Sequence, residues 1–188
     1  VESLAGRYIT AEDVGTSFED MAFVRQETRY VAGLTDPSPV TARGVARALA
    51  AAARHRWGSE ELGGRTIAIQ GCGHVGSALA RQLAAAGARL TVCDVDAARA
   101  EQCAAASGAT VAAAEAIYDV TADIYSPCAL GGTLNADTIP RLQCGIVVGA
   151  ANNQLALPGD ADRLAARGVL YVPDYVANAG GVIDGARD

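Results

Sequence analysis

The sequence feature that most constrains the fold is the glycine-rich turn Gly71-Cys72-Gly73-His74-Val75-Gly76, which has the spacing G-x-G-x-x-G. An apolar run at 65–70 precedes this turn and predicts a buried strand. An apolar segment at 74–86 follows it and predicts a helix that ends at Gly87. Alone, the glycine spacing is a weak signal, but between a strand and a helix it becomes a strong one.

Each glycine has its own role in such a strand–turn–helix unit. The first permits the tight turn, the second lets the backbone approach a diphosphate, and the third lets the helix pack closely on the strand. The start of the helix offers unpaired N–H groups and a partial positive charge to the phosphates. We therefore expect a dinucleotide cofactor to contact Gly71, Gly73, His74, Val75 and Gly76.

Strands and helices alternate along most of the chain. Further strands are predicted at 89–93, 123–125, 145–148 and 169–172, and further helices at 41–56, 97–107 and 160–167. Short apolar strands that alternate with helices indicate an α/β fold of the Rossmann type. We expect a doubly wound, mostly parallel sheet with helices on both faces.

The first 37 residues are more polar than the rest and end in Asp36-Pro37-Ser38-Pro39. The two prolines predict a turn or hinge at this point. We therefore divide the chain into a short N-terminal piece, residues 1–37, and a nucleotide-binding Rossmann domain, residues 38–188.

An acidic residue, Asp94, ends the strand at 89–93 and lies 18 residues after Gly76. A carboxylate at this place accepts hydrogen bonds from both ribose hydroxyls of the adenosine and repels a 2′-phosphate, which favours NAD over NADP. Asp96 is a nearby competitor for the role, and a solvated acid at a strand end is the alternative interpretation.

Two loops that contain asparagine also follow predicted strands, at 149–154 and 173–181. The carboxyl ends of parallel strands meet at one edge of the sheet, where open α/β sheets bind ligands. An amide both donates and accepts hydrogen bonds, as a nicotinamide carboxamide or an amino-acid substrate requires. Although asparagines also populate ordinary turns, two such loops beside a dinucleotide turn favour a functional role for Asn152 and Asn178.

The charge and the titratable residues exclude several classes of function. The formal net charge of −6 argues against nucleic acid or an anionic membrane as a partner, and no apolar run is long enough to span a bilayer. The histidines are only two: His74 lies in the phosphate turn, in a capping or phosphate-edge role, and His55 is expected on a helix surface. We therefore expect neither a metal site nor a histidine-based triad.

The five cysteines are odd in number and none has C-x-x-C spacing, which argues against a disulfide framework or a zinc ribbon. They are expected to be small buried residues in a reducing compartment, so we expect a cytoplasmic protein. All 15 basic residues are arginines. Without lysine, no side chain can form a Schiff base or act as a lysine acid or base.

Six segments in order along the chain together resemble the Glu/Leu/Phe/Val amino-acid dehydrogenases, in the branch of the leucine, phenylalanine and valine enzymes. They are Tyr8-Ile9-Thr10-Ala11-Glu12-Asp13-Val14-Gly15, Pro39-Val40-Thr41-Ala42, the glycine turn, Asp123-Ile124-Tyr125-Ser126-Pro127-Cys128-Ala129, Gly149-Ala150-Ala151-Asn152-Asn153 and Asn178-Ala179-Gly180-Gly181-Val182. The resemblance extends over essentially the whole sequence.

This resemblance implies reversible, NAD-dependent oxidative deamination of an L-amino acid to a 2-oxo acid and ammonia, in a protein that forms a homo-oligomer. It implies that Asp13 is the catalytic aspartate that exchanges protons with the amine. It further implies that Thr41, Ala150, Asn152 and Asn178 lie around the nicotinamide, with Asn152 and Val182 contacting the substrate, and that Gly71, Gly73, Gly76 and Asp94 bind the cofactor.

The same family uses lysines of an N-terminal substrate domain to hold the substrate carboxylate and to activate water, whereas this sequence contains no lysine. We therefore expect the chain to be the cofactor-binding half, with residues 1–37 as a remnant of the substrate domain. A naturally short imine reductase of a biosynthetic pathway, with Asp13 as its proton donor, and a non-catalytic NAD-binding module are the alternatives.

Overall fold

The computed structural model describes residues 1–13, 15–32 and 36–185. The chain forms two compact units, one of residues 1–37 with 181–188 and one of residues 38–180. The boundary between Pro37 and Ser38 lies in the segment for which the sequence predicts a turn or hinge. Residues 181–188, which we assigned from the sequence to the second domain, group with the first unit.

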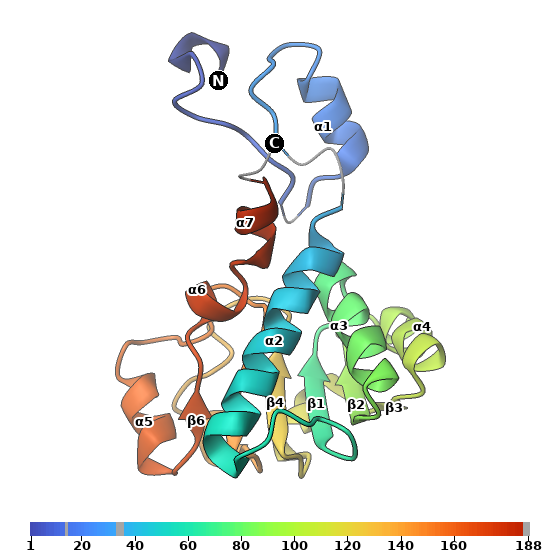
Figure 1. Ribbon diagram of the computed structural model, residues 1–188, viewed down its shortest axis with the longest axis vertical. Coiled ribbons are helices and arrows are strands. Elements are labelled where there is room, and N and C mark those ends of the chain that lie inside the picture. Colours follow the sequence, from blue (N-terminus) through green and yellow to red (C-terminus); the bar gives the residue numbers. More distant parts are fainter. Residues whose placement is uncertain (14, 33–35, 186–188) are drawn as a thin grey trace. The chain divides into compact units, whose positions relative to one another are not determined.

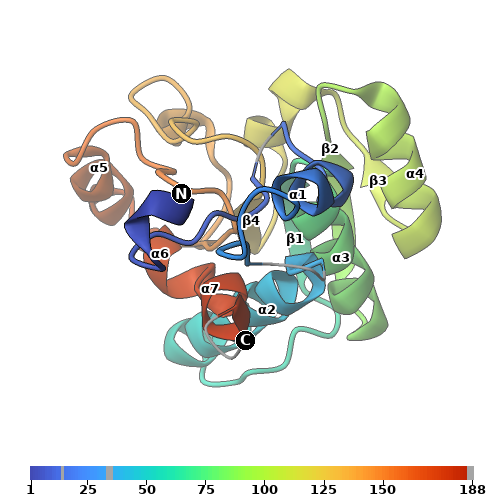
Figure 2. The same cartoon turned by 90° about the horizontal axis from the view of Figure 1, so that it is seen from above.

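The second unit is built on one six-stranded sheet (Figures 1 and 2). Its strands are β1 (Thr66–Gln70), β2 (Arg89–Cys93), β3 (Thr110–Val111), β4 (Ile124–Pro127), β5 (Ile146–Val147) and β6 (Leu170–Tyr171). Their order is β3-β2-β1-β4-β5-β6, and every neighbouring pair is parallel. This is the strand order of doubly wound dinucleotide-binding sheets, so the fold class expected from the sequence is confirmed.

The strand order changes direction between β1 and β4, because β1 continues to β2 on one side and the chain returns to β4 on the other. In open α/β sheets, ligands bind outside the carboxyl ends of the strands at such a switch point. The glycine turn follows β1 directly, so the fold places it at this point.

The helices of this unit cover both faces of the sheet (Figures 1 and 2). They are α2 (Ser38–Trp57), α3 (His74–Ala85), α4 (Ala97–Ser107), α5 (Asp160–Ala166) and α6 (Asp174–Ala177), with the short 3₁₀ helices η2 (Ala114–Asp119) and η3 (Ile139–Arg141). Pro39 lies in the first turn of α2, where its missing N–H leaves no helical hydrogen bond unmade.

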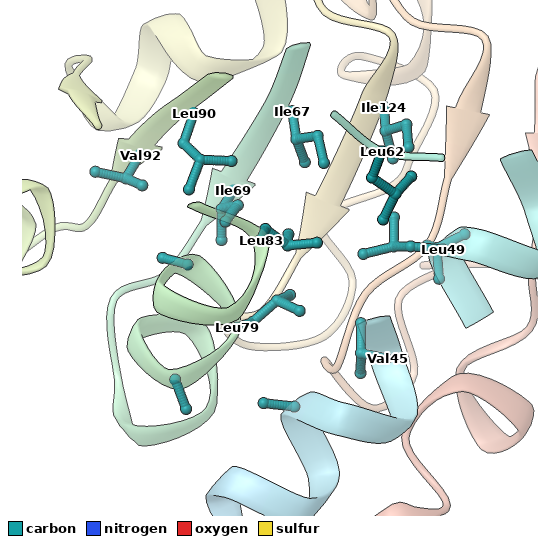
Figure 3. Close-up of a cluster of buried hydrophobic side chains, with 14 of the residues drawn as sticks. Val45, Leu49, Leu62, Ile67, Ile69, Leu79, Leu83, Leu90, Val92 and Ile124 are labelled. Atoms are coloured by element: carbon teal, nitrogen blue, oxygen red, sulfur yellow. The ribbon is translucent and has the colours of Figure 1, made fainter. Parts of the chain in front are cut away.

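One apolar core lies between the sheet and α2, α3 and α4. Figure 3 shows Val45 and Leu49 of α2 and Leu79 and Leu83 of α3 against the sheet residues of this core. Ile67 and Ile69 of β1 point to this side, whereas Ala68 belongs to the core on the opposite face, as the two-residue period of a strand requires. The second core contains buried residues of η2, η3 and α5, namely Ile117, Tyr118, Ile139 and Leu164.

Two differences from the sequence-based expectations follow from tertiary context. Strand β3 was not predicted, because its two residues are exposed and carry no burial pattern. The segment 173–181, predicted as a loop, contains α6 and the start of α7 (Gly180–Gly185). Helix α6 has only four residues, too few for a helical period to be visible in the sequence.

The first unit contains the 3₁₀ helix η1 (Glu2–Leu4) and α1 (Phe18–Val24). Helix α1 begins with a capping box, in which the Ser17 hydroxyl accepts from the Asp20 N–H and the Asp20 carboxylate accepts from the Ser17 N–H. The Ser17 hydroxyl and the Ser17 N–H both donate to the Asp20 carboxylate, and these two hydrogen bonds lower the pKa of Asp20. No helix within the described part of the chain is both long and apolar enough to cross a bilayer.

Candidate cofactor-binding site

The fold itself requires glycine at two positions of the phosphate turn. Gly71 has a φ of +98°, and a Cβ there would lie 2.7 Å from the backbone N of Ala129 in the loop after β4. A Cβ on Gly76 would lie 2.0 Å from the carbonyl oxygen of Gly71. Glycine at these positions therefore lets the turn, helix α3 and the loop after β4 pack backbone against backbone.

Gly73 differs, because nothing in the fold requires glycine there. Its φ is −71°, and an ideal Cβ on it would meet no heavy atom within 4 Å. Gly73 is the N-cap of α3 and makes no side-chain cap. The N–H groups of the first helical turn, which have no intrahelical partners, are thus reachable over an open surface. A diphosphate needs this approach, so the residues present fit a dinucleotide.

The side chains of His74 and Val75, also in the turn, differ in their exposure to solvent. The side chain of His74 is exposed, whereas that of Val75 packs against the apolar core. Val75 is partly buried, so its N–H is the group that the start of the helix offers to a cofactor. Cys72 is buried under the turn, and its hydrogen bond to Cys103 together with burial raises the pKa of its thiol, so it remains neutral.

Asp94 connects the end of β2 to the phosphate turn. One of its carboxylate oxygens accepts a hydrogen bond from the Cys72 N–H at 2.7 Å, and the other accepts from the Asp96 N–H at 2.9 Å. The Asp96 carboxylate caps α4 by accepting from the N–H groups of Ala98 and Arg99. Asp96 is thus engaged in capping, which leaves Asp94 as the better candidate for the ribose. The hydrogen bond that the turn donates to Asp94 was not predicted from the sequence.

The structure brings the two asparagine segments together. The Asn178 amide donates to the Asn152 side-chain oxygen at 2.6 Å and to the Ala150 carbonyl at 3.1 Å. Asp174, which sequence reasoning missed, accepts hydrogen bonds from the N–H groups of Asn153 and Tyr175. The signal that could have found Asp174 was its place two residues after the predicted strand 169–172, at the edge of the sheet where ligands bind.

Glycines also bring the loops after β4 and β5 into backbone contact. A Cβ on Gly149 would lie 2.1 Å from the Pro127 carbonyl oxygen, and one on Gly131 would lie 2.5 Å from the Asn152 carbonyl oxygen. The buried Gln154 donates its amide N–H to the Gly149 carbonyl at 2.9 Å. Backbone groups and a buried amide thus hold Asn152 on a rigid segment.

Thr41 lies in the first turn of α2, beside the segment that follows Asn178. A Cβ on Gly180 would lie 3.2 Å from the Thr41 Cα. Close backbone packing thus joins Thr41 to Gly180, two residues after Asn178. Hydrogen bonds of the Asn178 amide then join this segment to Ala150 and Asn152.

Two expected site residues, Asp13 and Val182, belong to the first unit. Asp13 is exposed in a turn in which its N–H donates to the Thr16 hydroxyl at 2.9 Å, and this hydroxyl donates back to the Asp13 carbonyl at 2.8 Å. The side chain of Val182 is 78% exposed. The catalytic role of Asp13 and the pocket role of Val182 stay predictions from the resemblance.

Two family models match overlapping parts of the chain. The model of the Glutamate/Leucine/Phenylalanine/Valine dehydrogenases matches residues 95–186. The model of the NAD binding domain of D-isomer specific 2-hydroxyacid dehydrogenases matches residues 40–130, which include the glycine turn and Asp94.

Characterised relatives match along the whole chain. A leucine dehydrogenase of Thermoactinomyces intermedius is 47% identical over 100% of this chain and 53% of the relative. A valine dehydrogenase of Streptomyces coelicolor is 48% identical over 100% of this chain and 54% of the relative. The chain thus spans about half the length of the curated relatives it matches.

Solved structures show the same fold. The crystal structure of L-tryptophan dehydrogenase from Nostoc punctiforme matches with a TM-score of 0.85 and 45% identity, over 99% of this chain and 55% of that one. A hetero-hexameric glutamate dehydrogenase from Thermus thermophilus matches with a TM-score of 0.78 and 24% identity, over 94% of this chain and 49% of that one.

Proposed function

The chain belongs to the Glutamate/Leucine/Phenylalanine/Valine dehydrogenase family, and on this premise we propose that it is an NAD-dependent oxidoreductase of the amino-acid dehydrogenase type. The proposed reaction is the reversible oxidative deamination of an apolar L-amino acid to a 2-oxo acid and ammonia. The observation that carries the cofactor part of this proposal is the open backbone surface at Gly73, where the fold itself does not require glycine.

The geometry of the second unit supports the following binding roles. The N–H groups at the start of α3 would hold the diphosphate, and Asp94 would accept the ribose hydroxyls with the lone pairs not used by Cys72 and Asp96. When bound, the nicotinamide ring supplies the hydride acceptor. Thr41, Ala150, Asn152 and Asn178 would orient the ring and the substrate.

The proton chemistry requires residues outside the second unit. Loss of hydride from Cα requires a neutral amine, so a carboxylate has to remove a proton, and we assign this step to Asp13. Water must then attack the carbon, for which a second base is needed. Since the sequence contains no lysine, we propose that this chain supplies the cofactor-binding half of the site and lacks the lysine-bearing substrate domain.

The sequence keeps the aspartate of the family motif, Asp13, but contains no lysine. This combination also favours a second candidate function, a short imine reductase in which Asp13 donates the proton. A non-catalytic NAD-binding module is the remaining alternative. All three candidate functions require the chain to bind the cofactor, and they differ in whether it catalyses a reaction and in which substrate reacts.

The test is to titrate the 188-residue chain with NADH and then to assay NAD reduction with leucine, valine and phenylalanine. We expect saturable NADH binding and little or no deamination by this chain alone, because the groups that hold the carboxylate and activate water are missing. Robust deamination would show that the lysines are dispensable, and a chain that never saturates with NADH would remove the basis of the whole proposal.

A second measurement tests the preference for NAD. Asp94→Ala is expected to weaken NADH binding by about 1.5–3 kcal/mol, the value of a hydrogen bond to a charged group. It should also reduce the difference in affinity between NADH and NADPH, because the carboxylate that repels the 2′-phosphate is gone. Asp96→Ala serves as the control, because the Asp96 carboxylate caps α4 and should not contact the ribose. Equal affinities of the unmutated chain for NADH and NADPH would contradict the role of Asp94.

The proposal extends to a small-molecule amino-acid or 2-oxo-acid substrate, a homo-oligomer and a cytoplasmic location. The location rests on the cysteine pattern of the sequence, in which five cysteines without C-x-x-C spacing argue against a disulfide framework.

A further inference from the structure

A polar link crosses the apolar face of the sheet that packs against η2, η3 and α5. The Gln70 amide donates to the Tyr118 hydroxyl at 2.7 Å, and its oxygen accepts from the Tyr125 hydroxyl at 2.7 Å. Tyr125 is 1% exposed and Tyr118 is 7% exposed, and both belong to the buried cluster between the sheet, η2, η3 and α5. Burial raises the pKa of Tyr125, so its hydroxyl remains a neutral donor.

The two tyrosines are themselves held in place. Their ring centroids lie 5.9 Å apart, and the Arg141 guanidinium lies 5.2 Å from the centroid of Tyr118. Arg141 is paired in turn with the Asp119 carboxylate at 2.7 Å. Both the nitrogen and the oxygen of the Gln70 amide bond to these tyrosine hydroxyls, which fixes the orientation of the amide group.

Gln70 is also the last residue of β1, directly before Gly71. Its carbonyl accepts from the Cys128 N–H at 2.7 Å, and the next N–H, that of Gly71, donates to the Cys93 carbonyl at 2.8 Å. The turn that follows contains two glycines in three residues, and glycine loses more conformational freedom on ordering than any other residue. A fixed starting point for this turn therefore lowers the entropy lost when the diphosphate binds.

Burial alone does not explain this choice of residue. An apolar side chain at position 70 together with phenylalanine at 118 and 125 would fill the same space without any polar group to desolvate. Resting on the proposed cofactor role of the turn, we propose that Gln70 is a positioning residue: through Tyr118 and Tyr125 it preorganises the phosphate turn for the diphosphate of the cofactor.

The same pair of strands offers a matched control at its other end. Asp123, just before β4, accepts hydrogen bonds from the Thr66 N–H at 2.8 Å and the Thr66 hydroxyl at 3.0 Å at the start of β1. This link also joins β1 to β4, which are neighbours in the sheet (Figure 1), but it lies at the strand ends opposite the turn. Thr66→Val removes the hydroxyl with little change in shape.

The experiment compares Gln70→Met, Tyr125→Phe and Thr66→Val by urea unfolding and by NADH titration. We expect Gln70→Met to raise the Kd for NADH roughly three- to tenfold, the effect of losing one or two buried hydrogen bonds. Tyr125→Phe should have a smaller effect in the same direction, and should add nothing in the Gln70→Met background. Thr66→Val should lower stability to a similar extent and leave Kd unchanged.

Three outcomes would overturn the positioning role: an unchanged Kd in both Gln70→Met and Tyr125→Phe, a Kd in Thr66→Val raised as much as in Gln70→Met, or fully additive effects of the two substitutions on Kd. Failure of the proposed function is a separate result, because then the unmutated chain would not saturate with NADH at all. If Gln70→Met does not fold, Tyr125→Phe, which keeps the ring, decides the question by its Kd.

Discussion

Gly73→Ala is expected to weaken NADH binding at least about a hundredfold, since an added methyl group would hinder two or more charge-assisted hydrogen bonds to the diphosphate. The same change should lower the free energy of unfolding by no more than about 1 kcal/mol. Alanine is a poorer N-cap than glycine, but its Cβ would meet no atom within 4 Å, and the loss of chain entropy in the unfolded state offsets part of the cost. NADH titration and urea unfolding of one protein sample measure both quantities.

Two further variants make this result interpretable. Gly76→Ala should destabilise the fold as well as abolish binding, because its Cβ would meet the Gly71 carbonyl oxygen at 2.0 Å. Asp13→Asn should retain NADH affinity, and in a form of the protein that turns over, it should lose activity. If Gly73→Ala binds NADH as the unmutated chain does, the diphosphate does not lie over this turn and the proposed function loses its main support.

Gly149→Ala is expected to lower the free energy of unfolding by at least about 3 kcal/mol, a large fraction of the stability of a typical domain. Its Cβ would lie 2.1, 2.6 and 2.7 Å from the carbonyl oxygen, nitrogen and carbonyl carbon of Pro127. All three are backbone atoms at the end of β4, so no side-chain rotation can relieve the contact. The effect is measured by urea unfolding or by the yield of folded protein.

Gly145→Ala is the control for this prediction, since Gly145 and Gly149 flank β5 on its two sides. The nearest atoms to a Cβ on Gly145 are 3.8 Å away, which is an ordinary van der Waals contact. Its unfolding free energy should therefore change by less than about 1 kcal/mol. Equal stability of the two variants would show that the loops after β4 and β5 can separate without loss of the fold.

Local signals were sufficient for the parts of the fold that depend on neighbours along the chain. The periodicity predicted β2 at 89–93 and α4 at 97–107 with the bounds that the structure has. The Asp96 cap and Gly108, in the left-handed conformation at the end of α4, explain why those ends were visible. The doubly wound parallel sheet followed from the alternation of strands and helices together with the glycine turn, whereas the order of its strands was not predicted.

The candidate site was only partly predictable, because its geometry depends on contacts between residues far apart in the chain. Asn152 and Asn178 were expected on the same edge of the sheet, but their mutual hydrogen bond spans 26 residues and needs both loops in place. The second acceptor of Asn178, the Ala150 carbonyl, and the part played by Asp174 likewise depend on the packing of β5 beside β6.

By itself the sequence determined that this protein builds a parallel α/β sheet with a dinucleotide turn after β1, because periodicity, glycine spacing and capping are properties of short stretches of chain. Only the tertiary structure decided which atoms from elsewhere in the chain surround the glycines of this turn. Gly71 and Gly76 are crowded by backbone atoms, and Gly73 is not. The motif assigns each glycine its role, but the atoms that crowd Gly71 belong to Cys128 and Ala129 in the loop after β4. No local pattern encodes that contact, because it depends on the packing of β4 beside β1.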